Sequence, residues 1–203
     1  RILAASSTLR LGALLVGLPS KGRQPVWADD STEDAPLAIA TSAIQSGSIA
    51  SDQVKLTTAE SVARFSVESG DLLVAMDGDG SLGKAAVYEG EAKATVDSHV
   101  ARCKTRDIPG LALTLSCYLN STWGRTQTEA LMTGATGQTQ LSPTDLCSVV
   151  IPESVVENSV RVAAGFAAAC RSFEPLGRKA RRLLCESAAT VSTILLKDGA
   201  IAA

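Results

Sequence analysis

The spacing of apolar residues changes twice along the chain and divides it into three parts. Up to residue 70 the apolar runs are short and lie between polar, turn-rich segments, a pattern that predicts short strands and loops. One short helix is expected over residues 59–65, with Thr57 or Thr58 as its N-cap and Glu60 as the acidic side chain of its first turn.

From residue 71 to residue 152 the apolar positions predict a sheet and a pair of buried helices. Runs of strand length or strand alternation precede Pro109, and leucines at helical spacing follow it. The polar stretch 133–142 has no periodicity and is expected to be a loop. The predicted strands are 71–76, 83–88, 95–103 and 146–151, and the predicted helices are 111–119 and 123–132.

Residues 153–203 carry apolar side chains at steps of three and four, which predicts two amphipathic helices with Pro175 at the start or at a kink of the second. The expected fold is therefore α/β (α+β): a globular domain with a mixed sheet over residues 1–152, followed by a C-terminal helical hairpin or coiled-coil arm over 153–203. The apolar positions expected at contacts between helices or with a partner are Val156, Val160, Phe166, Leu183, Val191 and Leu195.

Composition narrows the class of protein. A chain of 203 residues that is 45% hydrophobic can bury a sizeable core, and its 5 cysteines show no C-x-x-C spacing, so reduced thiols and a cytoplasmic location are expected. The apolar stretch 11–18 is shorter than the roughly 20 residues that a membrane span needs, so no membrane partner is expected.

The single histidine and the charge distribution limit the chemistry further. With His99 alone, two-histidine metal sites and Cys₂His₂ zinc sites are excluded, no metal is expected, and a hydrogen-bonded structural role is the favoured interpretation of this side chain. Residues 1–100 carry 8 basic and 13 acidic side chains, whereas residues 101–203 carry 11 and 8. Because nucleic-acid affinity depends on a local basic surface, a nucleic-acid partner stays open despite a net charge of −2.

A glycine-rich segment, residues 78–84, has the spacing of a phosphate-binding P-loop as far as Lys84, but Ala85 stands where a Ser or Thr would hold magnesium. The favoured interpretation is a tight connection between two strands, and the alternative is a nucleotide-binding enzyme that uses this loop. An EF-hand calcium loop is not supported, because Leu82 and Tyr88 occupy positions that need Gly and Glu.

Five short motifs follow one another in order: Gly70-Asp-Leu-Leu-Val-Ala, Asp77-Gly with Gly83-Lys84, Tyr118-Leu-Asn-Ser121 with Gly124-Arg125, the stretch from Thr133 to Ser142, and Asp145-Leu146 with Ile151-Pro152. In their order and spacing they resemble the target recognition domain of type I restriction-modification specificity subunits, from about residue 68 to residue 152. The resemblance implies a globular α/β domain that recognises DNA, followed by a helical spacer.

What the resemblance implies for function is a sequence-specific DNA recognition module without catalysis of its own, which directs a partner adenine DNA methyltransferase. This chain would bind no cofactor, and S-adenosylmethionine would be bound by the partner. The expected partners are double-stranded DNA, the methyltransferase subunit, a restriction subunit and a second copy of the chain.

Full specificity subunits resemble two such units in tandem, and this chain holds one. It is therefore expected to be a half-subunit that dimerises, or a recognition domain cut from a larger N6-adenine DNA methyltransferase polypeptide. The tail departs from the family, because Pro152 leads into Ala-rich helices instead of a long, highly charged coiled coil.

The side chains expected at the DNA are basic groups for phosphates and uncharged hydrogen-bonding groups for base edges. No catalytic residue is expected. A third class of function, a scaffold protein that assembles only through its helices, would show partner binding without DNA binding. The expected DNA-binding residues are Lys21, Arg23, Gln24, Lys84, Thr136, Gln138, Thr139 and Gln140.

Overall fold

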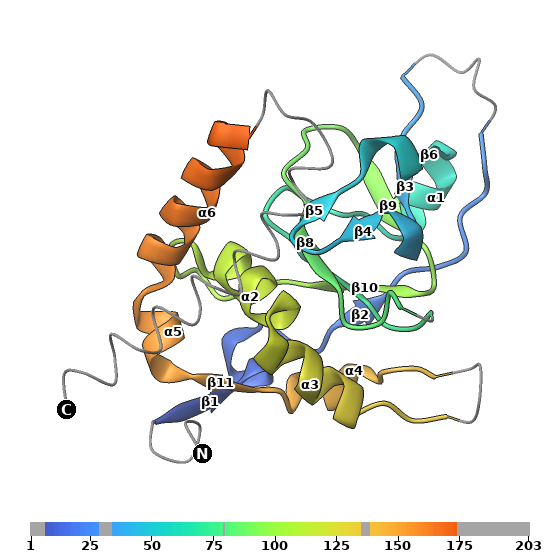
Figure 1. Ribbon diagram of the computed structural model, residues 1–203. Helices are drawn as coiled ribbons and strands as arrows, with labels where there is room; N and C mark the ends of the chain where they lie inside the picture. Colours follow the sequence, from blue (N-terminus) through green and yellow to red (C-terminus); the bar gives the residue numbers. More distant parts are fainter. Residues whose placement is uncertain (1–6, 29–33, 79, 135–138, 174–203) are drawn as a thin grey trace.

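The structure is a computed structural model that describes residues 7–28, 34–78, 80–134 and 139–173 (Figure 1). The strands are β1 (Thr8–Arg10), β2 (Ser20–Lys21), β3 (Leu37–Ile39), β4 (Ile44–Gln45), β5 (Ser48–Ile49), β6 (Lys55–Leu56), β7 (Leu72–Ala75), β8 (Ala85–Val87), β9 (Ala94–Val96), β10 (Val100–Cys103) and β11 (Val150–Pro152). The helices are α1 (Ala59–Arg64), α2 (Leu111–Asn120), α3 (Thr122–Ala130), α4 (Pro143–Cys147), α5 (Glu153–Glu157) and α6 (Ser159–Phe173). Short 3₁₀ helices cover Leu11–Leu14, Thr41–Ala43 and Ser51–Gln53.

An antiparallel sheet with the strand order β2-β10-β7-β8 forms the centre of the fold. All four residues of β7 are buried, so this strand is covered on both faces. A strand in that position is continuously apolar and does not alternate, which explains its Leu-Leu-Val-Ala sequence. The predictions of strands over 71–76 and 83–88 are confirmed as β7 and β8.

Two apolar cores lie on the two faces of this sheet, because successive side chains of a strand point to opposite faces. Leu72 and Val74 of β7 belong to the larger core, together with buried side chains of α2. Leu73 belongs to the smaller core, together with side chains of β3 and β9. Helix α2 packs against β7 and β8 on one side and against α6 on the other (Figure 1).

Three smaller sheets surround the central one. In the order β6-β3-β9, strand β3 is antiparallel to β6 and parallel to β9, so this sheet is mixed. Strands β4 and β5 form a hairpin, and β1 pairs with β11 far along the chain. The mixed α/β class is confirmed, with several small sheets in place of one.

The prediction of a single strand over residues 95–103 is wrong. Strands β9 and β10 belong to different sheets, and between them the Asp97 carboxylate accepts a hydrogen bond from the His99 backbone N–H at 2.9 Å. Aspartate favours such turns through this type of bond. Val96 and Val100 both lie in the smaller core, so the alternation of apolar positions continues across the turn and hides it from the sequence.

The prediction of a strand over residues 146–151 is wrong in its first half, where Leu146 lies in helix α4. The Ser142 hydroxyl accepts the Asp145 N–H at 3.0 Å, and a proline occupies the first turn, so a regular helix start precedes the strand. Strand β11 begins only at Val150 and, as expected, ends at Pro152.

The remaining helix predictions agree with the structure within a few residues. Helices α2 and α3 correspond to the predicted helices 111–119 and 123–132, and α1 corresponds to the predicted helix 59–65. Thr58, not Thr57, caps α1, because its hydroxyl accepts the Ser61 N–H at 3.4 Å.

The beginning of the tail is helical in two pieces, α5 and α6, that meet at Asn158. The Ser159 hydroxyl donates to the carbonyl of Pro109 at 2.9 Å, and the Thr114 hydroxyl donates to the carbonyl of Ser159 at 3.0 Å. These bonds fix α6 on α2. The second predicted tail helix, with Leu183, Val191 and Leu195, lies outside the described residues.

Two helical glycines allow a matched test of this packing. A Cβ on Gly124 would lie 2.3 Å from the carbonyl oxygen of Tyr118 and 2.6 Å from Cα of Leu119, whereas a Cβ on Gly165 would meet nothing within 4 Å. We expect Gly124→Ala to destabilise the protein by at least about 1–3 kcal/mol, because the backbone of α2 must move. Gly165→Ala should stabilise it by up to about 1 kcal/mol through helix propensity. Urea unfolding measures both, and equal midpoints for the two variants would contradict the packing of α3 on α2.

Candidate functional site

Four segments that are distant in sequence meet at one end of the central sheet. Strand β2 pairs with β10, and the N–H of Gly22 donates to the carbonyl of Val100 at 3.0 Å. The Met76 N–H donates to the carbonyl of His99 at 2.8 Å, and the Leu141 N–H donates to the carbonyl of Met76 at 2.7 Å. We call the described parts of residues 20–24, 76–84, 97–99 and 139–141 the loop face.

The loop face lies away from helix α6 (Figure 1). In Figure 1 the described parts of the connection between α3 and α4 project from the body on the side opposite α6, below the end of the sheet where β2 and β10 lie. Thr133 and Gln140 exchange two backbone hydrogen bonds of 3.0 Å at the base of this connection. The described ends of this connection are therefore paired with each other.

Asp77 occupies the centre of the loop face. Its Oδ2 atom lies 2.8 Å from Nδ1 of His99 and 3.6 Å from Nζ of Lys21, and its backbone pairs with Gln140. The Asp77 side chain is 21% exposed, that of Lys21 32% and that of His99 54%, so all three reach solvent. The hydrogen-bonded role expected of His99 is confirmed, and its partner is Asp77.

A second carboxyl group, that of Asp97, orders the turn between β9 and β10. The Asp97 side chain is buried and accepts the backbone N–H of His99 at 2.9 Å. Burial raises the pKa of the Asp97 carboxyl, and the negative charge of Asp77 acts in the same direction, while the hydrogen bond from His99, the His99 charge and the nearby Thr41 backbone lower it. The buried carboxyl thus orders the backbone that carries His99.

The expected DNA-binding residues separate into groups in the structure. Lys21 and Gln140 lie beside Asp77, and the exposed Arg23 and Gln24 follow Lys21 after one glycine. Lys84 is half-buried at the far end of the connection between β7 and β8, and Thr139 is half-buried. Thr136 and Gln138 lie outside the described residues.

Asp77, Asp97 and His99 were not expected at this site. The two partners of Asp77, Lys21 and His99, lie 22 or more positions away from it in the sequence. At such a separation the spacing of residues does not indicate a contact. A local signal existed only at Asp97, where an aspartate two residues before His99 is typical of a turn.

The glycine-rich segment 78–84 connects two antiparallel neighbours, β7 and β8, so a strand and not a helix follows it. A P-loop places its phosphate-binding backbone before a helix, and this geometry contradicts the nucleotide-binding interpretation. Gly78, Gly80 and Gly83 have positive φ angles, as a tight connection requires. Helix α3 holds the segment, because the Arg125 guanidinium donates to the carbonyl of Leu82 at 2.7 Å.

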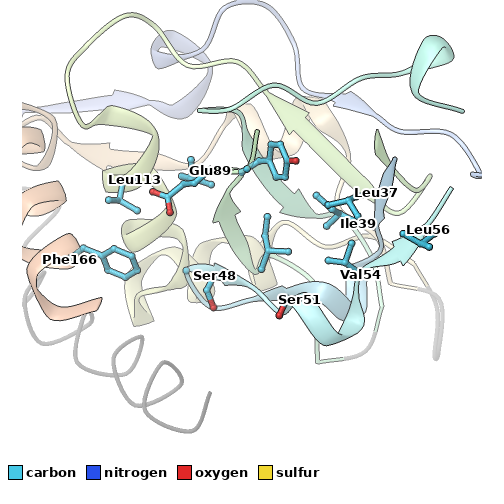
Figure 2. A pocket seen from close by; sticks show the side chains of 14 residues that line it. Leu37, Ile39, Ser48, Ser51, Val54, Leu56, Glu89, Leu113 and Phe166 are labelled. Atoms are coloured by element: carbon cyan, nitrogen blue, oxygen red, sulfur yellow. The ribbon is translucent and has the colours of Figure 1, made fainter. Parts of the chain in front are cut away.

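The residues expected at helix or partner contacts also differ from one another. Val156 is half-buried against the larger core, whereas the side chain of Val160 on α6 is 61% exposed. Phe166 lines an apolar cavity of about 540 Å³. In Figure 2 Phe166 and Leu113 lie on one side of this cavity, and Ile39 and Val54 lie on the other.

Two negative findings hold for the part of the chain that the structure describes. No group of three or more His, Cys, Asp or Glu side chains there is arranged to hold a metal ion. No helix within the described ranges has the length and apolarity that a membrane crossing requires.

No family model matches the sequence, and no curated protein matches it. Solved structures with the same fold exist. The HsdS subunit from Thermoanaerobacter tengcongensis is 20% identical with a TM-score of 0.57, and the match covers 89% of this chain and 45% of that chain. The S subunit of a type I restriction-modification system from M. genitalium is 15% identical with a TM-score of 0.53, and the match covers 84% and 41%.

A third match is a chain from a structure of complex assembly and conformational transition in the type I R-M system. It is 15% identical with a TM-score of 0.51, over 90% of this chain and 45% of that one. The resemblance to the specificity-subunit recognition domain is thus confirmed at the level of the fold. The chain spans less than half the length of each of these three proteins.

The raised pKa of Asp97 predicts a pH dependence of stability. The folded state binds the Asp97 proton more tightly than the unfolded state, so ionised Asp97 lowers the stability of the protein at neutral pH. This loss of stability disappears as the pH falls, first through the pKa of Asp97 in the folded state and then through its pKa in the unfolded state. Asp97→Asn removes the ionisation. We expect the melting temperature of the variant, relative to wild type, to be highest at about pH 7 and to fall towards about pH 4.

Asp97→Asn also removes one acceptor oxygen, which changes the melting temperature of the variant by a similar amount at every pH. The informative quantity is therefore how the difference in melting temperature between variant and wild type varies with pH. Asp107→Asn changes an exposed carboxyl group and serves as the control. A difference between Asp97→Asn and wild type that does not vary with pH would contradict the buried position of this carboxyl.

Proposed function

We propose that this chain is a sequence-specific DNA recognition module of a type I restriction-modification system, which directs a partner adenine DNA methyltransferase and performs no catalysis itself. One observation carries the proposal: 89% and 84% of this chain match the fold of two S subunits of such systems. The ordered motifs of the sequence point to the same family independently of the fold.

The loop face is the proposed DNA-contacting surface. Arg23 is an exposed cation beside the exposed amide of Gln24, and the exposed amide of Gln140 lies on a neighbouring segment. A guanidinium suits phosphate oxygens or the acceptor edge of guanine, and an amide suits the donor and acceptor of adenine in the major groove. Phosphate contacts would set the register of the domain on the duplex, and the amides would read bases.

The partners follow from what a recognition module lacks. A methyltransferase subunit would supply bound S-adenosylmethionine and the methyl transfer, and a restriction subunit would join it. Since the chain spans less than half of each matching protein, we propose that a second unit of this kind, in a homodimer or a longer polypeptide, completes the specificity function. We propose that the recognition domain ends at residue 152 and that the helical region after Pro152 is the element for assembly with partners. Val160 is exposed in this region.

Selection from a pool of duplexes with a randomised centre tests this function directly. The full chain should enrich a defined short sequence, and its affinity should fall as the salt concentration rises because phosphate binding releases counterions. Enrichment of no sequence by the chain, alone and together with the methyltransferase subunit, would exclude the proposed function.

The same assay locates the surface. Arg23→Ala should lower the slope of log affinity against log salt by about 0.9, the value for one lost phosphate contact, or relax the selected sequence if Arg23 reads a base. Arg161→Ala removes another exposed arginine, on α6 and away from the loop face, and should leave both the slope and the selected sequence unchanged. Equal effects of the two substitutions would mean that the loop face is not the DNA surface.

A further inference from the structure

Asp77 places an acidic group in the centre of the loop face, where basic groups would raise the affinity of a DNA-binding surface for phosphates. Two cations of the loop face, Lys21 and His99 when it is protonated, have their nitrogen atoms 3.6 Å and 2.8 Å from the same carboxylate oxygen. The backbone around Asp77 is fixed by pairing with Gln140 and by the Met76 bonds to both flanking segments. The carboxylate is therefore held between the two cations by the fold.

Charge at this place has opposite effects on the two components of DNA binding. Phosphate contacts by mobile cations raise affinity for every sequence and carry no sequence information. A carboxylate that neutralises such cations, and itself repels phosphates, lowers the sequence-independent component. Specificity is a ratio of affinities, so lowering binding to wrong sequences raises it as effectively as improving contacts to the right one.

We propose that Asp77 is a specificity-determining residue that restrains Lys21 and His99 and so suppresses sequence-independent binding to DNA. This role rests on the proposed DNA-recognition function. Lys21 is then not a primary phosphate contact, and the exposed Arg23 carries that part instead.

The groups that face His99 agree with a restraining role. The Asp77 carboxylate accepts from Nδ1 of the ring, Asp97 accepts the backbone N–H, and Lys21 reaches the same Asp77 oxygen from the adjacent strand β2. Because an ionised carboxylate only accepts, a neutral His99 ring must carry its proton on Nδ1 in this geometry. This tautomer gives a readout that needs no DNA.

The test uses the full chain with Asp77→Asn, which keeps the side-chain shape and removes the charge. Salt bridges this exposed contribute little to stability, so the variant should fold. We expect the affinity of the variant for a random-sequence duplex to fall more steeply with salt concentration than that of wild type. One new phosphate contact should enlarge the fall in affinity between about 50 and 200 mM salt by about 3.5-fold. The ratio of affinities for the selected and the random duplex should fall.

Glu68→Gln is the matched control. Glu68 pairs with Lys104 at 2.7 Å, just beyond the end of β10 that lies opposite His99, so the substitution also releases a lysine but away from the loop face. It should change neither the salt slope nor the affinity ratio. The double variant Lys21→Ala with Asp77→Asn should return the salt slope towards the wild-type value, because the released lysine is then absent.

Nitrogen-15 NMR of the imidazole checks the contact itself, and His99 is the only histidine of the 203 residues, so an untagged chain gives one ring signal. At about pH 8.5, where imidazoles are neutral, wild type should show the Nδ1–H tautomer, and Asp77→Ala should shift it towards Nε2–H. An Nε2–H tautomer in wild type would overturn the inference.

The outcomes separate this inference from the proposed function. Wild type that selects a sequence, with an unchanged or shallower salt slope for Asp77→Asn, overturns the role of Asp77 and leaves the function standing. Wild type that binds no duplex overturns both. A steeper slope, a lower affinity ratio and reversal by Lys21→Ala support the inference.

Discussion

Burial of β7 on both faces is the constraint on which the rest of the structure depends. A strand without an exposed face needs a neighbouring strand on each edge and an apolar layer on each side, and β10, β8 and the two cores meet these needs. The body of such a strand cannot carry surface chemistry. Its end can, and Met76 and Asp77 lead directly from β7 into the loop face.

Polar groups of α2 and α3 then fix the connection that leaves β7. The Asn120 side chain accepts the Ala85 N–H at 3.1 Å and donates to the Ala85 carbonyl at 2.7 Å, and the Ser116 hydroxyl donates to the same carbonyl at 3.0 Å. These bonds satisfy the backbone at the start of β8, which has β7 as its only partner in the central sheet. The glycine-rich segment is therefore held where it enters β8.

The loop face combines this rigid support with mixed charge. Its backbone is tied to the sheet by main-chain bonds, while Arg23, Gln24 and Gln140 are exposed to solvent. Two carboxyl groups serve different purposes there, since buried Asp97 orders the turn and partly exposed Asp77 contacts cations. The loop face therefore presents exposed hydrogen-bonding groups beside a lysine that is paired with a carboxylate.

The sequence by itself determined the mixed α/β class, the strands β7 and β8, the helices α2 and α3, and the helical start of the tail, because apolar periodicity reports burial directly. The ordered motifs also indicated the specificity-subunit fold. Where periodicity was misleading, at the turn before His99 and at α4, a backbone N–H that donates to the side chain of Asp97 or Ser142 decided the local structure.

Only the tertiary structure decided which polar residues share a surface. Lys21, Asp77 and His99 meet because β2, β7 and β10 are neighbours in one sheet, and Gln140 joins them through a backbone pairing with Asp77. None of these contacts lies within one helical or strand repeat, so no spacing in the sequence encodes them. Their geometry depends on the strand order, which long-range apolar packing fixes.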